Sequence, residues 1–312
     1  MPSAVGVDVS KDELVIAVVP KGEPISIANR PRAIKKWLST LAEPPLVGVE
    51  STGSYHEDLV HLAHSAGCPV FLLDARRLSA YRKAMGVRAK TDRCDAELIA
   101  QYVSREHLQL HAYRPPAPHI AALQRLLRRR ARVVQSKVRL EATLKGCPEC
   151  RTEARAVLRS LTALIRRIDE QCEELLGQQS ESSESRDRLM SIPGVGKLCS
   201  IGLHVLLART PYRNSDALIA GLGLDPRPND SGQHKGRRRL TKRGPSELRR
   251  LLYLAAVTAV RNAAFRPIYL RARSRGLGAV PSLLTVARKI ARIAFAIDRA
   301  GTRFDVTKLQ TA

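Results

Sequence analysis

The sequence has 312 residues, which is long enough for two domains with hydrophobic cores. Its 53 Lys and Arg residues outnumber 29 Asp and Glu residues and give a net charge of +24, which favours a polyanionic partner over an acidic small molecule. Because no apolar run is long enough to span a membrane and the first twenty residues carry charges, we expect neither a membrane protein nor a secreted one.

Strands and helices alternate over residues 1–112. Val5, Val7 and Val9 alternate with small or polar residues, which predicts a strand, and the apolar run at 14–19 predicts its hairpin partner at the edge of a mixed sheet. The following patterns predict helices at 32–41, 55–66 and 91–104 and strands at 46–50 and 69–73. This alternation predicts an α/β domain whose sheet is largely covered.

Residues 113–187 have the pattern of a helical hairpin or coiled coil. Apolar residues recur at helical spacing from residue 119 to about residue 188, and Cys147-Pro148 marks the expected turn. Cys147 and Cys150 have the spacing of half a zinc knuckle, but no second pair follows, so reduced thiols in a cytoplasm are the favoured interpretation. The Ser- and Glu-rich stretch 178–185 is predicted to be a linker.

Residues 188–312 are predicted to form a mostly α-helical domain. The Pro-Gly-Val-Gly turn at 193–196 lies between two apolar helical patterns, as in a helix-hairpin-helix motif, and would offer backbone amides to a phosphate. An ordinary structural turn explains the same residues equally well. After a polar, Gly-rich loop at 221–244, three further helices are predicted at 247–264, 268–275 and 283–299.

Four carboxylates of the N-terminal domain are candidates for one metal site. Asp8 lies on the first strand, Glu50 ends a later strand, and Asp92 and Asp95 share one face of a helix. Such like charges gather only where cations offset them, and hard oxygen ligands select Mg²⁺, with Mn²⁺ as the alternative. Two such ions assist an in-line phosphoryl displacement. Taken singly, each acid also has an ordinary structural explanation, as a turn, a helix cap or the partner of an arginine.

The polar loop carries a Ser-Gly pair, Ser231 and Gly232. Over 227–250 nine basic residues stand against two acidic ones, so the loop is expected to hold phosphates. A serine hydroxyl on a turn can reach a phosphodiester, but it needs a base or a metal to activate it. Read alone, the Ser-Gly pair is an ordinary turn and the basic run a nonspecific nucleic-acid contact.

Two basic clusters are the candidate nucleic-acid contacts. One belongs to the polar loop at 221–244 that carries Ser231, called the serine loop below. The other belongs to the first helix of the hairpin, which has eight basic residues against one acid between 119 and 145. Their members are Lys235, Arg237, Arg238, Arg239, Lys242 and Arg243 in the loop, and Arg128, Arg129 and Arg130 in the helix. The aromatic content of 4% argues against base stacking and favours contacts to the phosphate backbone.

Four sequence blocks resemble one family. The segments VGVDVSKDEL at 5–14, VGVESTGSY at 47–55 and KTDRCDAELIA at 90–100 are similar, in order and spacing, to the DEDD, RuvC-like domain of the IS110 family of insertion-sequence transposases. The segment GLGLDPRPNDSGQHKGRRRLTKRGPSELRRLLYLAA at 221–256 is similar to the C-terminal transposase domain of that family. The resemblance implies a ribonuclease H-like N-terminal fold, with Asp8, Glu50, Asp92 and Asp95 as metal-binding acids and Ser231 as the nucleophile.

On this resemblance the protein is expected to be a transposase that cuts and rejoins the DNA of a mobile element through a phosphoserine intermediate, with Mg²⁺ assisting. The resemblance also implies several partners. They are the DNA of the element ends and of the target, a structured noncoding guide RNA, and further copies of the chain. In the resulting homo-oligomer, a dimer or tetramer, the acids of one protomer meet Ser231 of another. Such a protein acts in the cytoplasm, at the nucleoid.

Three other functions are weighed against this one. A hydrolytic RuvC-like junction nuclease would cut without retaining DNA on the protein. A noncatalytic nucleic-acid-binding protein would use its acids as salt-bridge partners. An actin-like sugar kinase shares the same core, but the second domain and the Gly-rich adenosine site that it needs are not visible in the sequence.

Overall fold

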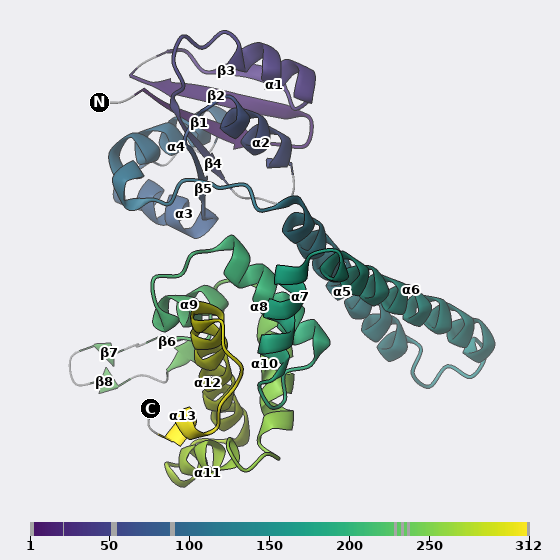
Figure 1. Ribbon diagram of the computed structural model, residues 1–312. Coiled ribbons are helices and arrows are strands. Elements are labelled where there is room, and N and C mark those ends of the chain that lie inside the picture. Colours follow the sequence, from purple (N-terminus) through teal and green to yellow (C-terminus); the bar gives the residue numbers. More distant parts are fainter. Residues whose placement is uncertain are drawn as a thin grey trace. The chain divides into compact units, whose positions relative to one another are not determined.

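The chain folds into two compact units, Met1–Pro115 and Pro116–Ala312 (Figure 1). The computed structural model describes residues 3–20, 22–50, 55–87, 91–227, 230–231, 234–235 and 238–310. The sequence-based division has three segments, at 1–112, 113–187 and 188–312, whereas here the helical hairpin shares one unit with the C-terminal helices.

The N-terminal unit is built on a mixed sheet with the strand order β3-β2-β1-β4-β5. Its strands are β1 (Ala4–Val9), β2 (Glu13–Val19), β3 (Ile25–Ala28), β4 (Leu46–Glu50) and β5 (Val70–Leu73). β1 pairs antiparallel with β2 and parallel with β4, and β4 pairs parallel with β5. The predicted β1–β2 hairpin is present, but its predicted edge position is wrong, because the short β3 adds to β2 and places β1 in the middle of the sheet.

Helices cover both faces of this sheet. They are α1 (Pro31–Leu38), α2 (Glu57–Ser65), α3 (Ala75–Ala84) and α4 (Asp92–Glu106), with a short 3₁₀ turn at His107–Gln109. On one face Val5 and Val7 pack with residues of α1 and α2, including Trp37. On the other face Phe71 packs with Ile99 of α4. The predicted α/β arrangement is therefore confirmed, although α3 was not expected from the sequence.

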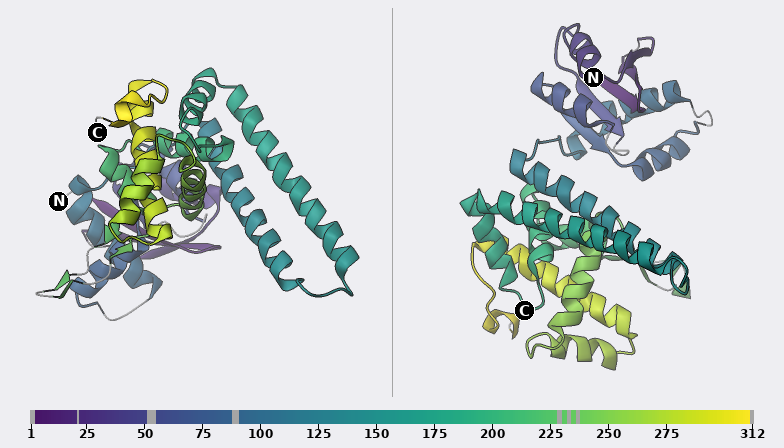
Figure 2. Two further views of the ribbon diagram at one scale, coloured as in Figure 1. Left: turned by 90° about the horizontal axis from the view of Figure 1, so that it is seen from below. Right: turned by 90° about the vertical axis from the view of Figure 1, so that its right-hand side faces the viewer.

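The C-terminal unit is helical apart from short strand pairs. Its helices are α5 (Pro118–Thr143), α6 (Arg151–Gly177), α7 (Ser180–Met190), α8 (Lys197–Arg209), α9 (Ser215–Leu222), α10 (Ser246–Ala259), α11 (Arg266–Ser274), α12 (Ala279–Ala300) and α13 (Thr307–Gln310). α5 and α6 run side by side and turn at Cys147-Pro148, as predicted (Figure 2). The three helices predicted after the loop are α10, α11 and α12.

The core of this unit is formed mainly by α12 and its neighbours. Val286, Ile290 and Ala294 recur every fourth residue on α12 and are fully buried against other helices, among them α10 with Leu252. α12 ends at Gly301, which adopts the left-handed conformation that terminates many helices. Among the described residues, no helix is long and apolar enough to cross a membrane.

The prediction of a linker at 178–185 is wrong in part, because this stretch contains the start of α7. Its Ser182 and Ser185 are buried, and both hydroxyls have histidine partners from other helices. The Nε2 atom of His119 lies 3.1 Å from the Ser182 hydroxyl, and the Nδ1 atom of His204 lies 3.0 Å from that of Ser185. The two histidines, which are distant in the sequence, satisfy the hydroxyls of the buried serines. A Ser-rich stretch that would be typical of a solvated loop can therefore form a helix with a buried face.

Candidate functional site

The strand register places two of the predicted acids at the same end of neighbouring strands. β1 and β4 are parallel, with Gly6 opposite Gly48 and Val7 opposite Val49. Since side chains alternate along a strand, Asp8 projects on the same face as Gly6, and Glu50 on the same face as Gly48. Asp8 and Glu50 therefore lie side by side, at the carboxyl ends of their strands.

Two glycines allow helix α4 to pack directly on this face of the sheet. A Cβ atom added to Gly6 would lie 2.1 Å from the carbonyl oxygen of Ala96, and one added to Gly48 would lie 2.5 Å from a methyl carbon of Val103. Any side chain at Gly6 would thus push α4 off the sheet. The close approach brings the first turn of α4, with Asp92 and Asp95, to the strand ends that carry Asp8 and Glu50.

The electrostatics of Asp8 show that three of the four acids are close together. Burial raises the pKa of Asp8 above its usual value, and the negative charges of Asp92 and Glu50 raise it further. A hydrogen bond from the backbone of Val9 and the charge of Arg82 act in the opposite direction. At neutral pH this group of acids therefore carries a repulsion that a cation would relieve.

The fourth acid, Asp95, is paired with an arginine. Arg82 of α3 forms an ion pair with the Asp95 carboxylate, and both side chains are about four-fifths buried, with 20% and 18% exposed. Sequence reasoning missed Arg82 because it did not predict α3. A signal was present, since Asp74 precedes the helix and caps it by accepting hydrogen bonds from the backbone N–H groups of Arg76 and Arg77.

The acids suit a divalent cation by their chemistry, although their side chains do not surround one point. Within the described ranges, no three His, Cys, Asp or Glu side chains are grouped so as to hold a metal ion. The donor set of Asp8, Glu50, Asp92 and Asp95 nevertheless consists of hard oxygens, and Asp8 is held in a field of like charges. Four hard-oxygen donors are therefore present at one end of the sheet.

The serine loop contains two short antiparallel strand pairs. β6 (Pro226–Arg227) pairs with β9 (Arg239–Leu240), and β7 (Asp230–Ser231) pairs with β8 (His234–Lys235). Ser231 is opposite His234 in this antiparallel pairing. The predicted loop residues Gly232 and Arg237 lie outside the described residues, and for Ser231 and Lys235 the structure describes only the backbone.

The predicted nucleic-acid contacts differ in how far they are exposed. Arg238, Arg239, Lys242 and Arg243 are exposed on the C-terminal side of the loop. On α5, Arg128 and Arg129 are exposed, whereas Arg130 is half-buried and binds Asp169 of α6, with its Nη2 atom 3.1 Å from Oδ2. Arg130 thus joins the two helices of the hairpin.

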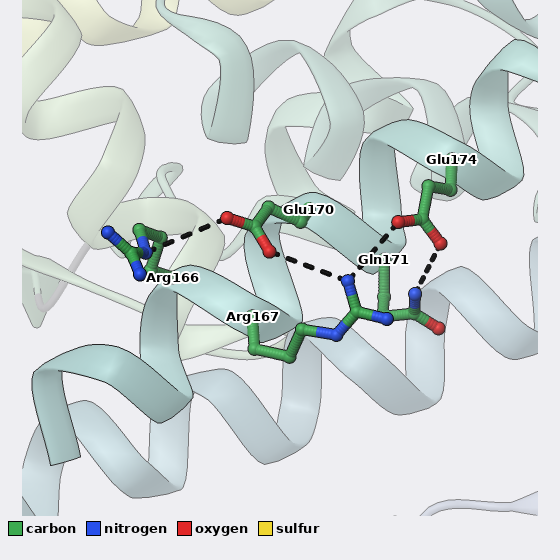
Figure 3. Close-up of polar contacts among 5 residues, drawn as sticks. All are labelled: Arg166, Arg167, Glu170, Gln171 and Glu174. Carbon is green, nitrogen blue, oxygen red and sulfur yellow. Dashed lines mark hydrogen bonds and ion pairs between the residues drawn. The ribbon is translucent and has the colours of Figure 1, made fainter. Parts of the chain in front are cut away.

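One face of α5 carries a row of arginines that was not predicted as a pattern from the sequence. Arg125, Arg128, Arg129 and Arg132 are all exposed and follow the spacing of one helical face. Arg166 and Arg167 of α6 form ion pairs with acids of their own helix (Figure 3). Arg167 lies 3.5 Å from Glu170 and 3.3 Å from Glu174, and Arg166 lies 3.6 Å from Glu170. The exposure of the row on α5 makes it a candidate for phosphate contacts.

The turn between α7 and α8 has the predicted helix-hairpin-helix arrangement, but its first glycine has a packing role. Gly194 has a φ of +87°, and a Cβ atom there would lie 2.3 Å from the carbonyl oxygen of Ala255 in α10. The close contact between this turn and α10 explains why a glycine is needed. Phosphate binding by the turn stays a prediction.

Comparisons with known proteins match both units. A family model described as a transposase matches residues 5–147, and one described as the transposase IS116/IS110/IS902 family matches residues 186–270. The pilin gene-inverting protein of Moraxella lacunata is 29% identical over 266 residues, covering 82% of this chain and 81% of the relative. The transposase for insertion sequence element IS1111A of Coxiella burnetii is 25% identical, over 94% of this chain and 88% of the relative. The transposase for IS1328 of Yersinia enterocolitica is also 25% identical, over 96% and 98%.

Proposed function

The chain belongs to the IS110 family of transposases, and from that premise we propose that it cuts and rejoins the DNA of a mobile element through a covalent bond to Ser231. The two family matches, which together include all four acids and Ser231, carry this proposal. The pilin gene-inverting relative is named for a DNA rearrangement, which supports recombination over hydrolysis.

In the proposed reaction, the Ser231 oxygen attacks a phosphorus atom of the DNA backbone. A bond forms between the serine oxygen and phosphorus, the bond from phosphorus to one sugar oxygen breaks, and the serine proton is replaced by the phosphoryl group. The freed sugar hydroxyl gains a proton. Because the phosphodiester energy is kept in the protein–DNA bond, a second sugar hydroxyl can reverse the step and join a new strand without ATP.

The acids Asp8, Glu50, Asp92 and Asp95 would hold Mg²⁺, with Mn²⁺ as the alternative. When bound, such an ion stabilises negative charge on the reacting phosphate and promotes loss of the serine proton. The five-stranded mixed sheet, with Asp8 and Glu50 at its strand ends, supports a ribonuclease H-like fold for this domain. Arginines of the serine loop would bind the phosphates that flank the reacting one.

Nucleic acid is the proposed partner of the basic surfaces. The net charge of +24 and the exposed arginines of α5 support binding of more than one strand, and we assign these strands to the element ends, the target and a structured noncoding guide RNA. We further propose a homo-oligomer, a dimer or tetramer, in which the acids of one protomer serve Ser231 of another. The assignment of the strands and of the oligomer rests on the resemblance to the family.

The test is excision of the element from a plasmid that carries it together with this gene. Changing Ser231 to Ala is expected to abolish excision and to leave binding of an element-end duplex within a few-fold of the parent. Ser246→Ala is the matched control, because Ser246 is exposed at the start of α10, just beyond the same loop. The control should excise normally.

The alternative with structural support is a hydrolytic junction nuclease, because the carboxylates alone suit metal-assisted hydrolysis. The same variants separate the two functions. A nuclease would keep cutting after Ser231→Ala and lose cutting after Asp8→Asn. Retained excision in the Ser231→Ala variant would overturn the recombinase proposal.

A further inference from the structure

The two ends of the serine loop meet at one arginine side chain. The Nη1 atom of Arg249, on α10, donates hydrogen bonds to three backbone carbonyl oxygens. One is that of Leu222, at 3.0 Å, where the chain enters the loop. The others are those of Arg243, at 3.2 Å, and Gly244, at 2.9 Å, where the chain leaves it. A single guanidinium group therefore joins the entry and the exit.

The backbone around this arginine is closely packed. Gly223 and Gly244 have φ values of +66° and +93°, and a Cβ atom at either position would lie about 2 Å from a carbonyl oxygen of the opposite chain end, at 2.1 Å and 1.9 Å respectively. The backbone N–H of Lys242 donates to the carbonyl of Gly223 at 3.2 Å, and that of Thr241 donates to Asp225 at 3.1 Å. The loop base thus has a defined geometry.

Arg249 differs in this respect from the arginine beside it. Burial lowers the pKa of the Arg249 guanidinium, in agreement with a side chain that has exchanged water for carbonyl groups. Arg250 instead forms a two-bond ion pair with Glu247 of its own helix, at 2.6 and 2.9 Å, and its side chain is 45% exposed. The two neighbours offer a test in which charge is constant and only the contacts differ.

We propose that Arg249 is a positioning residue that fixes both ends of the serine loop and thereby sets where Ser231 meets the scissile phosphate. This inference rests on the proposed role of Ser231. The Nη1 atom shares its hydrogens among three carbonyl oxygens from two separate segments, so loss of this side chain would release the entry and the exit of the loop together. Small displacements of a reacting group by distant changes reduce rates strongly, by about 100-fold for 1 Å.

The experiment compares Arg249→Gln, Arg249→Lys and the control Arg250→Gln in the full chain. Two measurements are made on each variant: hydrogen exchange at the amides of Thr241 and Lys242, and the single-turnover rate at which an element-end duplex becomes covalently bound. In Arg249→Gln we expect exchange to accelerate about tenfold and the covalent step to slow by about 100-fold, with duplex binding unchanged. Arg249→Lys should fall between this variant and the parent, and Arg250→Gln, whose side chain is paired with Glu247, should show the hydrogen exchange of the parent.

The two readouts separate failure of this inference from failure of the proposed function. Exchange reports the loop base without any reaction, so unchanged exchange in both Arg249 variants would overturn the inference whatever the reaction proves to be. Equal rate losses in Arg249→Gln and Arg250→Gln would also overturn it, because a loss of charge would then explain both. If Arg249→Gln does not fold, the exchange and rate of Arg249→Lys decide. If exchange accelerates in the Arg249 variants but the parent forms no covalent product, the result would instead reject the role of Ser231 as the nucleophile.

Discussion

At the scale of single residues, two glycines decide where the candidate acids of the N-terminal domain lie. Gly6 and Gly48 are each two residues before an acid, so each marks the place where α4 contacts the strand that carries Asp8 or Glu50. The sequence alone presents these glycines as ordinary strand residues. Their role becomes clear only from the backbone of α4 that lies against them.

Changing Gly6 to Ala is expected to destabilise the N-terminal domain by about 3 kcal/mol, because the new Cβ atom would overlap the backbone of Ala96. Chemical denaturation of the full chain measures the effect. Gly22→Ala is the control, since nothing lies within 4 Å of a Cβ atom there. Equal stability of the two variants would contradict the close contact between α4 and the sheet.

The raised pKa of Asp8 leads to a second prediction. The folded chain holds the Asp8 proton more tightly than the unfolded chain. The free energy of unfolding therefore decreases as the pH rises from 3.8, the ordinary pKa, through the raised pKa of the folded state. Asp8→Asn should therefore increase the melting temperature at neutral pH without divalent ions. Mg²⁺ should raise the melting temperature of the parent and have little effect on Asp8→Asn. The control Asp12→Asn, at an exposed site, should keep the parent's response to Mg²⁺.

At the scale of elements, helices and strands with strong periodicity were predictable, and those defined by tertiary contacts were not. The alternation around Val5, Val7 and Val9 identified β1, and the acids of α4 were placed on one helical face correctly. β3 has only four residues and α3 has one buried residue, Leu78; the two elements are held by pairing with β2 and by the Asp74 cap. An arginine partner for Asp95 was an ordinary explanation of that acid, but Arg82 itself was not identified because α3 was not predicted.

Helix α7 illustrates how buried polar contacts override a loop-like composition, and it predicts a pH effect. Burial, together with the charges of His119 and Arg188, lowers the pKa of His204, which is bonded to Ser185, from an ordinary 6.5 to about 4. Between these values the unfolded chain binds a proton that the folded chain excludes, so stability falls as the pH decreases from 6.5 to 4, by at most about 3 kcal/mol. His204→Gln should flatten this dependence in denaturation measured across that range. An unchanged slope would contradict the assignment.

At the scale of the whole molecule, the large positive charge is distributed unevenly between two otherwise similar helices. Arg125, Arg129 and Arg132 of α5 are exposed on one helical face, whereas Arg166 and Arg167 of α6 form ion pairs with Glu170 and Glu174. Phosphate contacts release counterions, so each contact contributes about 0.9 to the slope of log binding constant against log salt. The double variant Arg129→Gln, Arg132→Gln should reduce that slope by about 2 for an element-end duplex. Arg166→Gln, Arg167→Gln changes charge equally and should leave the slope close to that of the parent; equal losses in both pairs would indicate only a nonspecific charge effect.

The most direct measurement is to trap the reaction of the full chain with an element-end duplex, digest the protein, and locate the attached nucleotide by mass spectrometry. A covalent bond at Ser231 is expected, dependent on Mg²⁺ or Mn²⁺ and absent when Asp8 is changed to Asn. Recombination that proceeds with no nucleotide attached to the chain, or with one attached to a different residue, would contradict the assignment of Ser231 as the nucleophile.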